Sequence, residues 1–159
     1  MIVPSDALPR LLAHDAPVAC GIYPRKLPPY SPAVFQFQPN PEDPDLPLLV
    51  DDNQDVTTPR QIGATGLGAA LVRADVYTQM AAHFDDRMWH HASSLEQGAE
   101  GEDTHFFRRL HEMEVAVLCD PTVRFGHVRD QVLTIEDFLQ TIEESPERPP
   151  TVMSDTDDP

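Results

Sequence analysis

The chain has 159 residues, of which 40% are hydrophobic, and this suits one domain with a buried core rather than a disordered polypeptide. Its net charge of −16 argues against non-specific binding to nucleic acid or to an anionic membrane surface, because both need basic groups. No stretch approaches the roughly 20 apolar residues of a membrane span, and no signal peptide is visible at the N-terminus, so we expect a cytoplasmic protein.

The first half of the chain is predicted to hold a helix, short strands and a long proline-rich loop. Residues 4–14 carry leucines at helical spacing, with Ser5 as a plausible N-cap. Residues 16–23 (APVACGIY) then form a strand that ends before Pro24. Residues 24–60 are rich in proline and irregular, a composition typical of a functional or mobile segment. Two short strands are expected inside this segment, AVFQFQ and PLLVDDNQDVT.

A glycine-rich segment opens the second half. Gly63, Gly66 and Gly68 make a permissive loop that runs into an apolar strand, AALVR, and then into a helix near residues 74–84. The glycines precede a strand rather than a helix, and no Gly-Lys-Ser/Thr follows, so the segment does not match a phosphate-binding loop. A flexible turn and a backbone that a ligand can approach closely both remain open.

The remaining elements alternate between helix and strand. A helix begins near Asp103, and VAVLCDP and VRFGHV are predicted as two strands after it. Thr134, with Asp137 three residues later, predicts a capping box at the start of the last helix. Residues 146–159 are acidic and proline-rich, and a disordered tail is expected there. The alternation predicts an α/β layered domain over residues 1–145.

Two cysteines, Cys20 and Cys119, each lie in a short apolar run. Free cysteine is among the most buried residue types, whereas a disulfide framework needs more cysteines and a secretory setting. We therefore expect two buried thiols in strands.

The stretch GEDTHFFRRL, residues 101–110, places two carboxylates at the start of a helix. At helical spacing Asp103 shares a face with three apolar side chains, those of Phe106, Phe107 and Leu110. Its carboxylate would lie at the inner edge of the helix near the positive end of the helix dipole, which is expected to keep it ionised, as a general base requires. The alternative is that Asp103 is simply the N-cap, a position where aspartate is favoured.

Three histidines and the single tryptophan are further candidates. His127 follows a glycine and an apolar run, and is either a structural residue or a ligand. His90 and His91 are adjacent, a spacing that chelates one metal ion poorly. Trp89, beside them, either stacks on a sugar ring through its apolar face or anchors its own loop.

The order of these motifs resembles the C-terminal half of GT-A fold glycosyltransferases, especially the inverting, family-2-like enzymes. The resemblance covers about residues 1–128 and is strongest over residues 63–127. The family carries a glycine-rich loop, matched by GATGLGAALVR, and an x-Glu-Asp motif that opens a helix, matched by GEDTHFFRRL. Its Asp-Pro turn and late histidine are matched by Asp120-Pro121 and by His127.

The resemblance implies a partial GT-A mixed sheet flanked by helices, and transfer of a sugar from a nucleotide-diphosphate donor to a hydroxyl acceptor with inversion. Asp103 would be the base that deprotonates the acceptor, and Glu102 would set the site or touch the acceptor. His127 would bind a divalent metal, Mn²⁺ or Mg²⁺, that neutralises the diphosphate leaving group. The donor and acceptor cleft would be lined by Gly63, Gly66, Gly68 and Trp89.

The family's Asp-x-Asp motif and its nucleotide-binding half have no match in this sequence. In the family, Asp-x-Asp ends a strand just before a segment like MIVPSDALPRLLAHD, with which this chain begins. The literal Asp-x-Asp strings, at 43–45 and 155–157, lie in a proline loop and in the expected tail. We therefore expect a C-terminal part that is inactive unless an N-terminal half-protein supplies the donor and metal sites.

The alternative function is a non-catalytic binding or assembly module, or a subunit of a split enzyme derived from a glycosyltransferase. If the chain stands alone, its strand at residues 16–23 is expected to expose an unpaired edge where the missing sheet would sit. Such an edge favours association with another chain.

Overall fold

The structure is a computed structural model that describes residues 1–43, 47–52, 57–84, 101–128 and 132–144. Its helices are α1 (Ala7–Leu12), α2 (Ala74–His83), α3 (Glu102–Glu112) and α4 (Ile135–Glu144), with a short 3-10 turn, η1 (Leu67–Ala69). Its strands are β1 (Val18–Ile22), β2 (Val34–Gln38), β3 (Leu48–Asp51), β4 (Arg60–Ile62), β5 (Ala64–Thr65), β6 (Ala70–Val72), β7 (Val117–Arg124), β8 (His127–Val128) and β9 (Val132–Leu133).

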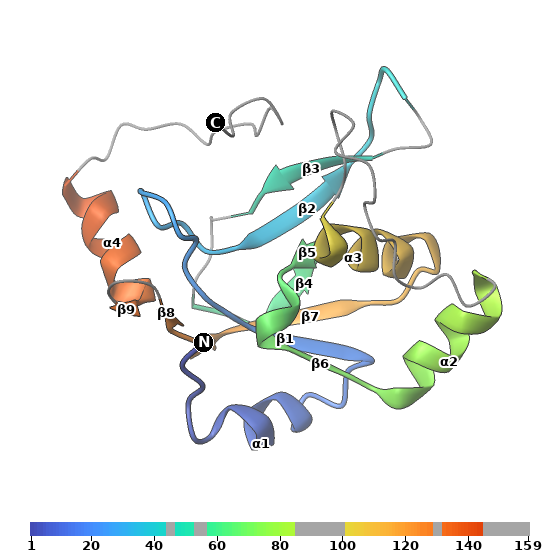
Figure 1. Ribbon diagram of the computed structural model, residues 1–159, viewed down its shortest axis with the longest axis horizontal. Coiled ribbons are helices and arrows are strands. Elements are labelled where there is room, and N and C mark those ends of the chain that lie inside the picture. Colours follow the sequence, from blue (N-terminus) through green and yellow to red (C-terminus); the bar gives the residue numbers. More distant parts are fainter. Residues whose placement is uncertain (44–46, 53–56, 85–100, 129–131, 145–159) are drawn as a thin grey trace.

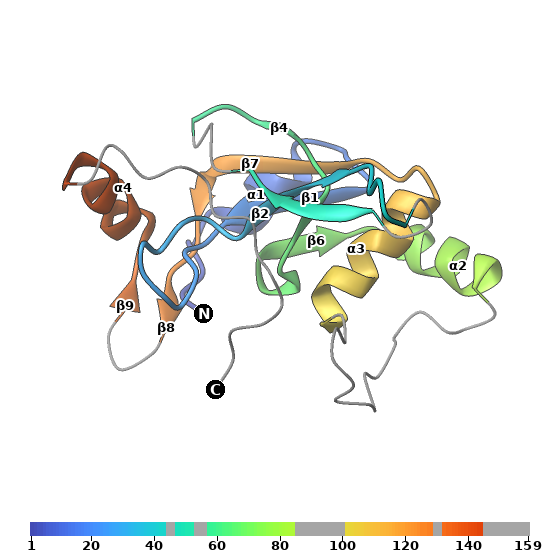
Figure 2. The ribbon, with the colours of Figure 1, turned by 90° about the horizontal axis from the view of Figure 1, so that it is seen from above.

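These strands form three sheets within an α/β fold (Figure 1). The largest is a mixed sheet of four strands in the order β4-β7-β1-β6, beside a three-stranded sheet in the order β3-β2-β5 and the pair β8-β9. Seen from above, α4 and the β8-β9 pair lie at one end of the molecule and α2 at the other (Figure 2). No helix in the described part of the chain is long and apolar enough to cross a membrane.

β1 lies inside the four-stranded sheet and is buried on both faces. It pairs in parallel with β7 and antiparallel with β6. Its residues alternate between two apolar clusters, since Cys20 packs with α2 and α3 whereas Ala19 packs with α1. A strand covered on both faces needs apolar side chains on both, which explains the unbroken run VACGI. The expectation of an unpaired strand edge at residues 16–23 is therefore wrong. Among the described strands of this sheet, β4 and β6 are the edge strands.

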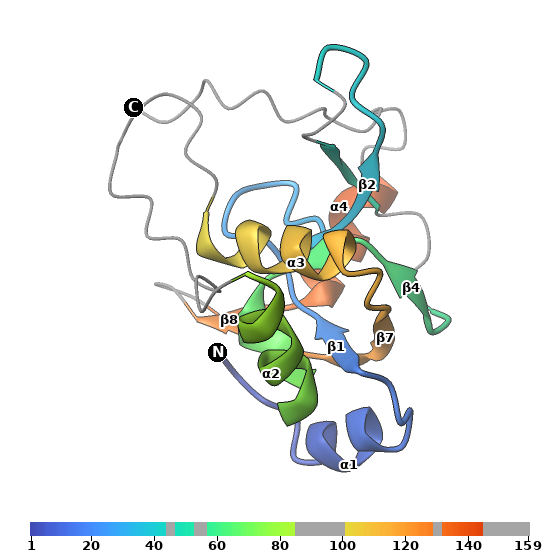
Figure 3. The same ribbon diagram turned by 90° about the vertical axis from the view of Figure 1, so that its right-hand side faces the viewer.

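The larger apolar cluster lies between this sheet and helices α2 and α3, which face the viewer in Figure 3. Phe106, Phe107 and Leu110 of α3 are fully buried, and Met80 of α2 packs in the same cluster. Burial of each such side chain contributes about 1.5–3 kcal/mol. The predicted apolar face of α3 is confirmed. Packing of this face sets the orientation of the helix, and therefore where its first turn lies.

β7 is a single strand of eight residues, where two strands were expected. Its register against β1 shifts between Cys119 and Arg124. Cys119 packs in the larger cluster, whereas Val123 packs with α1 in the smaller one. Residues four apart in a regular strand share a face, so the irregularity exchanges the two faces of β7. Pro121 has no N–H to donate to a ladder, and such bulges are where strands tolerate this loss. The Asp120-Pro121 pair, expected as a turn, therefore lies inside a strand.

The two cysteines are confirmed as buried thiols in strands. Cys20 of β1 and Cys119 of β7 are register partners in the parallel pair, and both are fully buried and free. Burial and their mutual hydrogen bond raise the pKa of the Cys20 thiol, with the hydrogen bond as the larger cause. They therefore act as small apolar core residues.

Two helix starts test the capping predictions. The N-cap of α1 is Asp6 rather than Ser5, and no side chain caps this helix of six residues. At α4 the capping box is confirmed: the Thr134 N–H donates to the Asp137 carboxylate at 2.6 Å, and the Asp137 N–H reaches the Thr134 hydroxyl at 3.4 Å. The expected tail, residues 146–159, lies outside the described residues.

Candidate active site

Asp103 lies in the first turn of α3 and is not its N-cap. Gly101 occupies the N-cap position, and Glu102 is the first helical residue. The Asp103 carboxylate instead accepts a hydrogen bond from the backbone N–H of Leu67, in the turn that follows the glycine loop. The capping alternative is therefore wrong, because this carboxylate reaches across to another segment of the chain.

The environment of Asp103 raises its pKa. Burial is the main cause, the Leu67 N–H opposes it, and the negative charge of Glu102 adds to the rise. Desolvation thus outweighs the stabilising hydrogen bond at this carboxylate, and its ionisation at neutral pH stays a prediction. A carboxylate whose pKa is raised is a stronger base than one in water, which suits proton abstraction.

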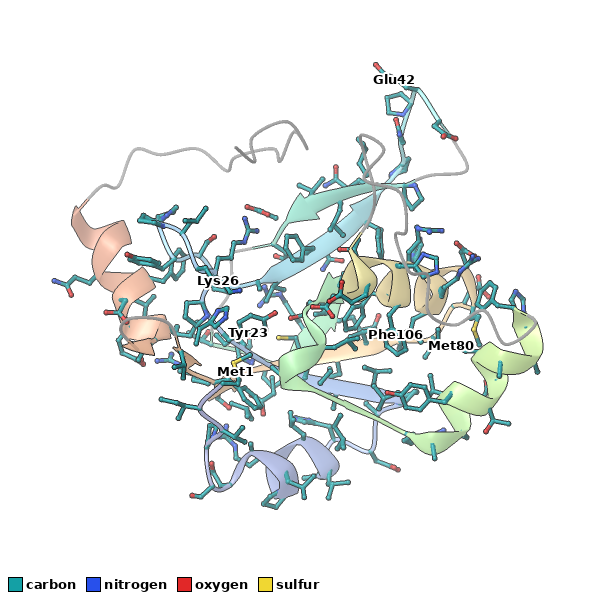
Figure 4. The ribbon with its side chains drawn as sticks, in the orientation of Figure 1. Met1, Tyr23, Lys26, Glu42, Met80 and Phe106 are labelled. Carbon is teal, nitrogen blue, oxygen red and sulfur yellow. The ribbon has the colours of Figure 1, made fainter. Side chains whose placement is uncertain are left out.

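Tyr23 brings a phenol hydroxyl next to this carboxylate. It follows the last residue of β1, and Figure 4 labels its side chain. Its hydroxyl oxygen accepts a hydrogen bond from the backbone N–H of Gly66. Burial, and after it the negative charge of Asp103, raises the pKa of Tyr23 to about 12. The consecutive N–H groups of Gly66 and Leu67 thus bind the two side chains.

Gly66 is required at this point for space. A Cβ at Gly66 would lie 1.6 Å from the Tyr23 hydroxyl oxygen and 3.1 Å from Asp103 Oδ2. Its backbone is extended, with φ −84° and ψ 147°, so most residues could adopt the conformation. A side chain there would collide with the Tyr23 hydroxyl, so glycine at this position is what lets the Tyr23 ring pack against the loop.

The other two glycines have different surroundings. Gly63 joins β4 to β5 and packs against β2, where its Cβ would lie 2.7 Å from the Phe37 backbone nitrogen. Gly68 faces the side chain of Met1, with a corresponding distance of 2.8 Å to the methyl carbon. Of the three candidates, Gly66 is the one that the fold brings to Asp103.

His127 lies against the ring of Tyr23. The two ring centroids are 5.6 Å apart at an interplanar angle of 84°. His127 Nδ1 lies 3.0 Å from the carbonyl oxygen of Pro24. A carbonyl can only accept, so Nδ1 carries a proton, and in the neutral imidazole Nε2 keeps its lone pair. Nε2 is therefore the atom of His127 that can ligate a metal ion or accept a proton.

The residues described around His127 do not by themselves fit Mg²⁺ or Mn²⁺. These cations prefer oxygen ligands. Within residues 1–43, 47–52, 57–84, 101–128 and 132–144, no group of three or more His, Cys, Asp or Glu side chains is placed to hold a metal ion. One imidazole supplies too few ligands to hold such an ion on its own.

The remaining candidates lie at the margin of the site or beyond it. Glu102 is exposed beside Asp103 and acts on it through its charge. Trp89, His90 and His91 lie outside the described residues.

Tyr23 was missed by sequence reasoning. The available signal was an aromatic residue with a polar tip at the end of an otherwise apolar strand, where a side chain leaves the core. That signal does not reveal which loop the hydroxyl meets. Gly66, the partner of the Tyr23 hydroxyl, lies 43 positions further along the chain, and only the fold brings these two residues together.

Comparisons with protein-family models, with curated proteins and with solved structures found no match to this chain. The site is therefore defined by its own geometry. That geometry is a half-buried carboxylate at the start of α3 and a phenol just after β1, which the N–H groups of Leu67 and Gly66 bind respectively, with an imidazole against the phenol ring.

Proposed function

We propose that this chain carries the acceptor side of a GT-A-like sugar-transfer site. Asp103 takes the proton of an acceptor hydroxyl, and the hydroxyl oxygen attacks the anomeric carbon of a nucleotide-diphosphate sugar. The new C–O bond forms as the bond to the diphosphate breaks, with inversion at that carbon. The observation that carries the proposal is a half-buried carboxylate of raised pKa at the start of α3, held by the backbone N–H of Leu67 and lying beside the Tyr23 hydroxyl.

The surroundings of His127 bear on the metal that the proposal needs. Ile2 pairs with Gly126 through hydrogen bonds of 2.7 and 3.0 Å, so residues near Met1 run beside His127. Carboxylates that join Nε2 of His127 in holding Mn²⁺ or Mg²⁺, to offset the diphosphate charge, would have to come from outside the described residues.

The deciding experiment is a transfer assay on the protein purified from its own host with its bound partners. A panel of nucleotide-diphosphate sugars is offered with alcohol acceptors and Mn²⁺ or Mg²⁺. We expect transfer by the natural protein and a loss of at least about 100-fold in kcat for Asp103→Asn, because general-base catalysis contributes roughly that much. Unimpaired turnover in this variant would remove Asp103 as the base, and the absence of transfer with every pair would refute the proposal.

The chain by itself is expected to bind no nucleotide-sugar. In the part of the chain that the structure describes, no group of three or more His, Cys, Asp or Glu side chains is placed to hold the metal that a nucleotide-diphosphate donor would need. Calorimetry with Mn²⁺ and the same donor panel measures this. Micromolar binding by the isolated chain would show that the donor site is already complete.

A second function, assembly with another polypeptide, is favoured by the edge of the main sheet. β6 pairs with β1 on one side and is an edge strand among the described residues. Beside it lies an apolar cleft of about 180 Å³. The cleft is lined by Leu11, Leu12, Asp15, Ala16, Leu71, Val72 and Arg73. Backbone groups on a strand edge are matched by an extended strand, so the proposed occupant is a strand of a partner polypeptide.

A further inference from the structure

The cleft beside β6 lies on the face of the main sheet that α1 covers. Leu71 of β6 packs with α1 in the smaller apolar cluster, and the wall of the cleft continues with Leu11 and Leu12 of that helix. The cleft volume of about 180 Å³ is close to that of an apolar cavity that holds one benzene molecule, about 150 Å³. The cleft therefore has room for one large apolar side chain.

The backbone of β6 offers a place for an added strand next to this cleft. β6 pairs antiparallel with β1, and the Arg73 N–H donates to the Pro17 carbonyl at 3.0 Å. Because hydrogen-bonded positions alternate along an antiparallel strand, Leu71 also bonds to β1, whereas Val72 directs its N–H and C=O toward the opposite edge. Among the described strands, none pairs with β6 on that edge. A strand added there would place alternate side chains on the α1 face, beside the cleft.

The charged groups at the cleft favour a basic occupant. Two charged residues line it, Asp15 and Arg73. Arg73 is already held by Asp75, whose carboxylate accepts from Nε at 2.9 Å and from Nη2 at 2.6 Å. Two carboxylates against one guanidinium leave a negative surplus, and the whole chain carries a net charge of −16. Asp15 is exposed, so a lysine or arginine of an incoming strand can reach it from solvent.

We propose that β6 and its cleft bind an extended, basic strand of a partner polypeptide, which places one large apolar side chain in the cleft and a lysine or arginine against Asp15. The inference rests on the assembly role proposed above and adds the chemistry of the partner. Main-chain hydrogen bonds to Val72 supply affinity, while the cleft and Asp15 select the sequence of the strand. Complementary charge also speeds the encounter. A second copy of this chain is disfavoured as the occupant, because it carries the same net charge of −16.

The first test uses the full chain and a phage-displayed library of random linear peptides. We expect enriched peptides in which apolar residues alternate with polar ones, and in which lysine and arginine outnumber aspartate and glutamate. A synthetic peptide of the enriched sequence is then added while amide hydrogen exchange is followed. Exchange at Val72 should slow about 10-fold, because its N–H gains a hydrogen bond. Exchange at Leu71 should change less, because its N–H is already bonded to β1.

Two pairs of variants test the cleft and the charge separately. Leu12→Glu places a charge in the cleft and should weaken peptide binding at least about 10-fold, whereas Leu27→Glu, at another exposed leucine, should not. Asp15→Asn removes one charge and should weaken binding about 3-fold. Asparagine also tolerates the positive φ of 48° at this position. Asp6→Asn removes a carboxylate that does not line the cleft, and it should leave the affinity unchanged at physiological ionic strength.

The outcomes separate this inference from the assembly role. Peptides that slow exchange at Val72 but lack basic residues, or that bind Asp15→Asn as tightly as the natural chain, would overturn the basic strand and keep the assembly role of the edge. A library without enrichment, or binding that leaves exchange at Val72 unchanged, would overturn both. Added salt should weaken binding of a basic strand, because screening reduces the attraction between unlike charges. Binding that strengthens with salt would likewise overturn the inference.

Discussion

At the scale of single residues, the ionised Asp103 carboxylate lowers the free energy of unfolding. Its pKa is raised chiefly by burial, so the folded chain binds a proton there more readily than the unfolded chain does. The stability linked to this proton is present in full below the unfolded pKa, near 3.8, and is lost as the pH rises through the higher folded pKa. At neutral pH the ionised carboxylate therefore opposes folding, a cost that a functional group can justify.

Replacing Asp103 by asparagine should remove this cost. At pH 7 the free energy of unfolding of Asp103→Asn should exceed that of the natural chain by about 0.5 kcal/mol, a small value because the side chain is partly exposed. The amide oxygen still accepts the Leu67 N–H, so the local structure is retained. Urea unfolding at pH 7 and pH 3 measures the effect, and the difference should vanish at pH 3. A variant clearly less stable at pH 7 would contradict this account.

At the scale of elements, α1 is fastened to β7 by polar contacts. A helix of six residues is too short to be stable alone, so tertiary contacts must hold it. Asp120 of β7 lies 3.0 Å from His14 Nε2 and 3.9 Å from an Arg10 nitrogen, and it accepts the Thr122 N–H at 2.9 Å. Arg10 also donates to the Thr122 hydroxyl. These contacts join α1 to the bulged part of the strand.

Asp120→Asn should weaken this attachment in a pH-dependent way. Burial alone would raise the pKa of Asp120, but hydrogen bonds from Thr122 and His14, with the charge of Arg10, outweigh burial and lower it. The stability that follows is present above the unfolded pKa, near 3.8, and is lost as the pH falls through the lower folded pKa. We expect a loss of about 1–3 kcal/mol at pH 7 and a smaller loss at pH 3.

Chemical denaturation of both proteins at the two pH values measures this prediction. Asp75→Asn on α2 is the control, because the pair that Asp75 forms with Arg73 is exposed and its loss should leave the unfolding curve unchanged. An equal loss for Asp120→Asn at both pH values would show that the contribution of Asp120 is not electrostatic.

At the scale of the whole molecule, the cleft beside β6 is lined in part by an exposed leucine, Leu12, and further apolar side chains are exposed on α1 and on the segment before it. Leu8 and Leu12 of α1 are each 58% exposed. Ile2 and Val3, on the segment that leads to α1, are 47% and 60% exposed. The net charge of −16 opposes contact between copies of the chain, so salt should favour it by screening.

The purified chain should therefore associate through this edge when its partner is absent. We expect the mass measured by light scattering after gel filtration to rise with concentration and with salt. Leu12→Glu should suppress association because it places a charge in the cleft, whereas Leu27→Glu alters another exposed leucine and should not. A monodisperse monomer under all these conditions would contradict an assembly role for the edge.

Much of the fold follows from local patterns. β1, β2, β3, α2 and α3 lie where apolar spacing and turn residues predicted them, because burial of one face requires a matching period. The capping box of α4 was likewise predictable, since its two residues are three positions apart. The bulge at Pro121 and the merging of two expected strands into β7 could not be predicted in this way. The partner strand β1, which defines their register, lies about 100 positions away in the chain.

The sequence by itself determined the α/β class, the buried cysteines, the apolar face of α3 and the presence of Asp103 at its start. Each of these depends on neighbours within a few positions of the chain. The tertiary structure alone decided that Leu67, and not the helix, holds the Asp103 carboxylate, and that Tyr23 stands beside it. It also decided that burial outweighs the Leu67 hydrogen bond at Asp103, so that the pKa of this carboxyl is raised. The physical reason is that desolvation and hydrogen bonding depend on distances between segments, which spacing along one segment does not contain.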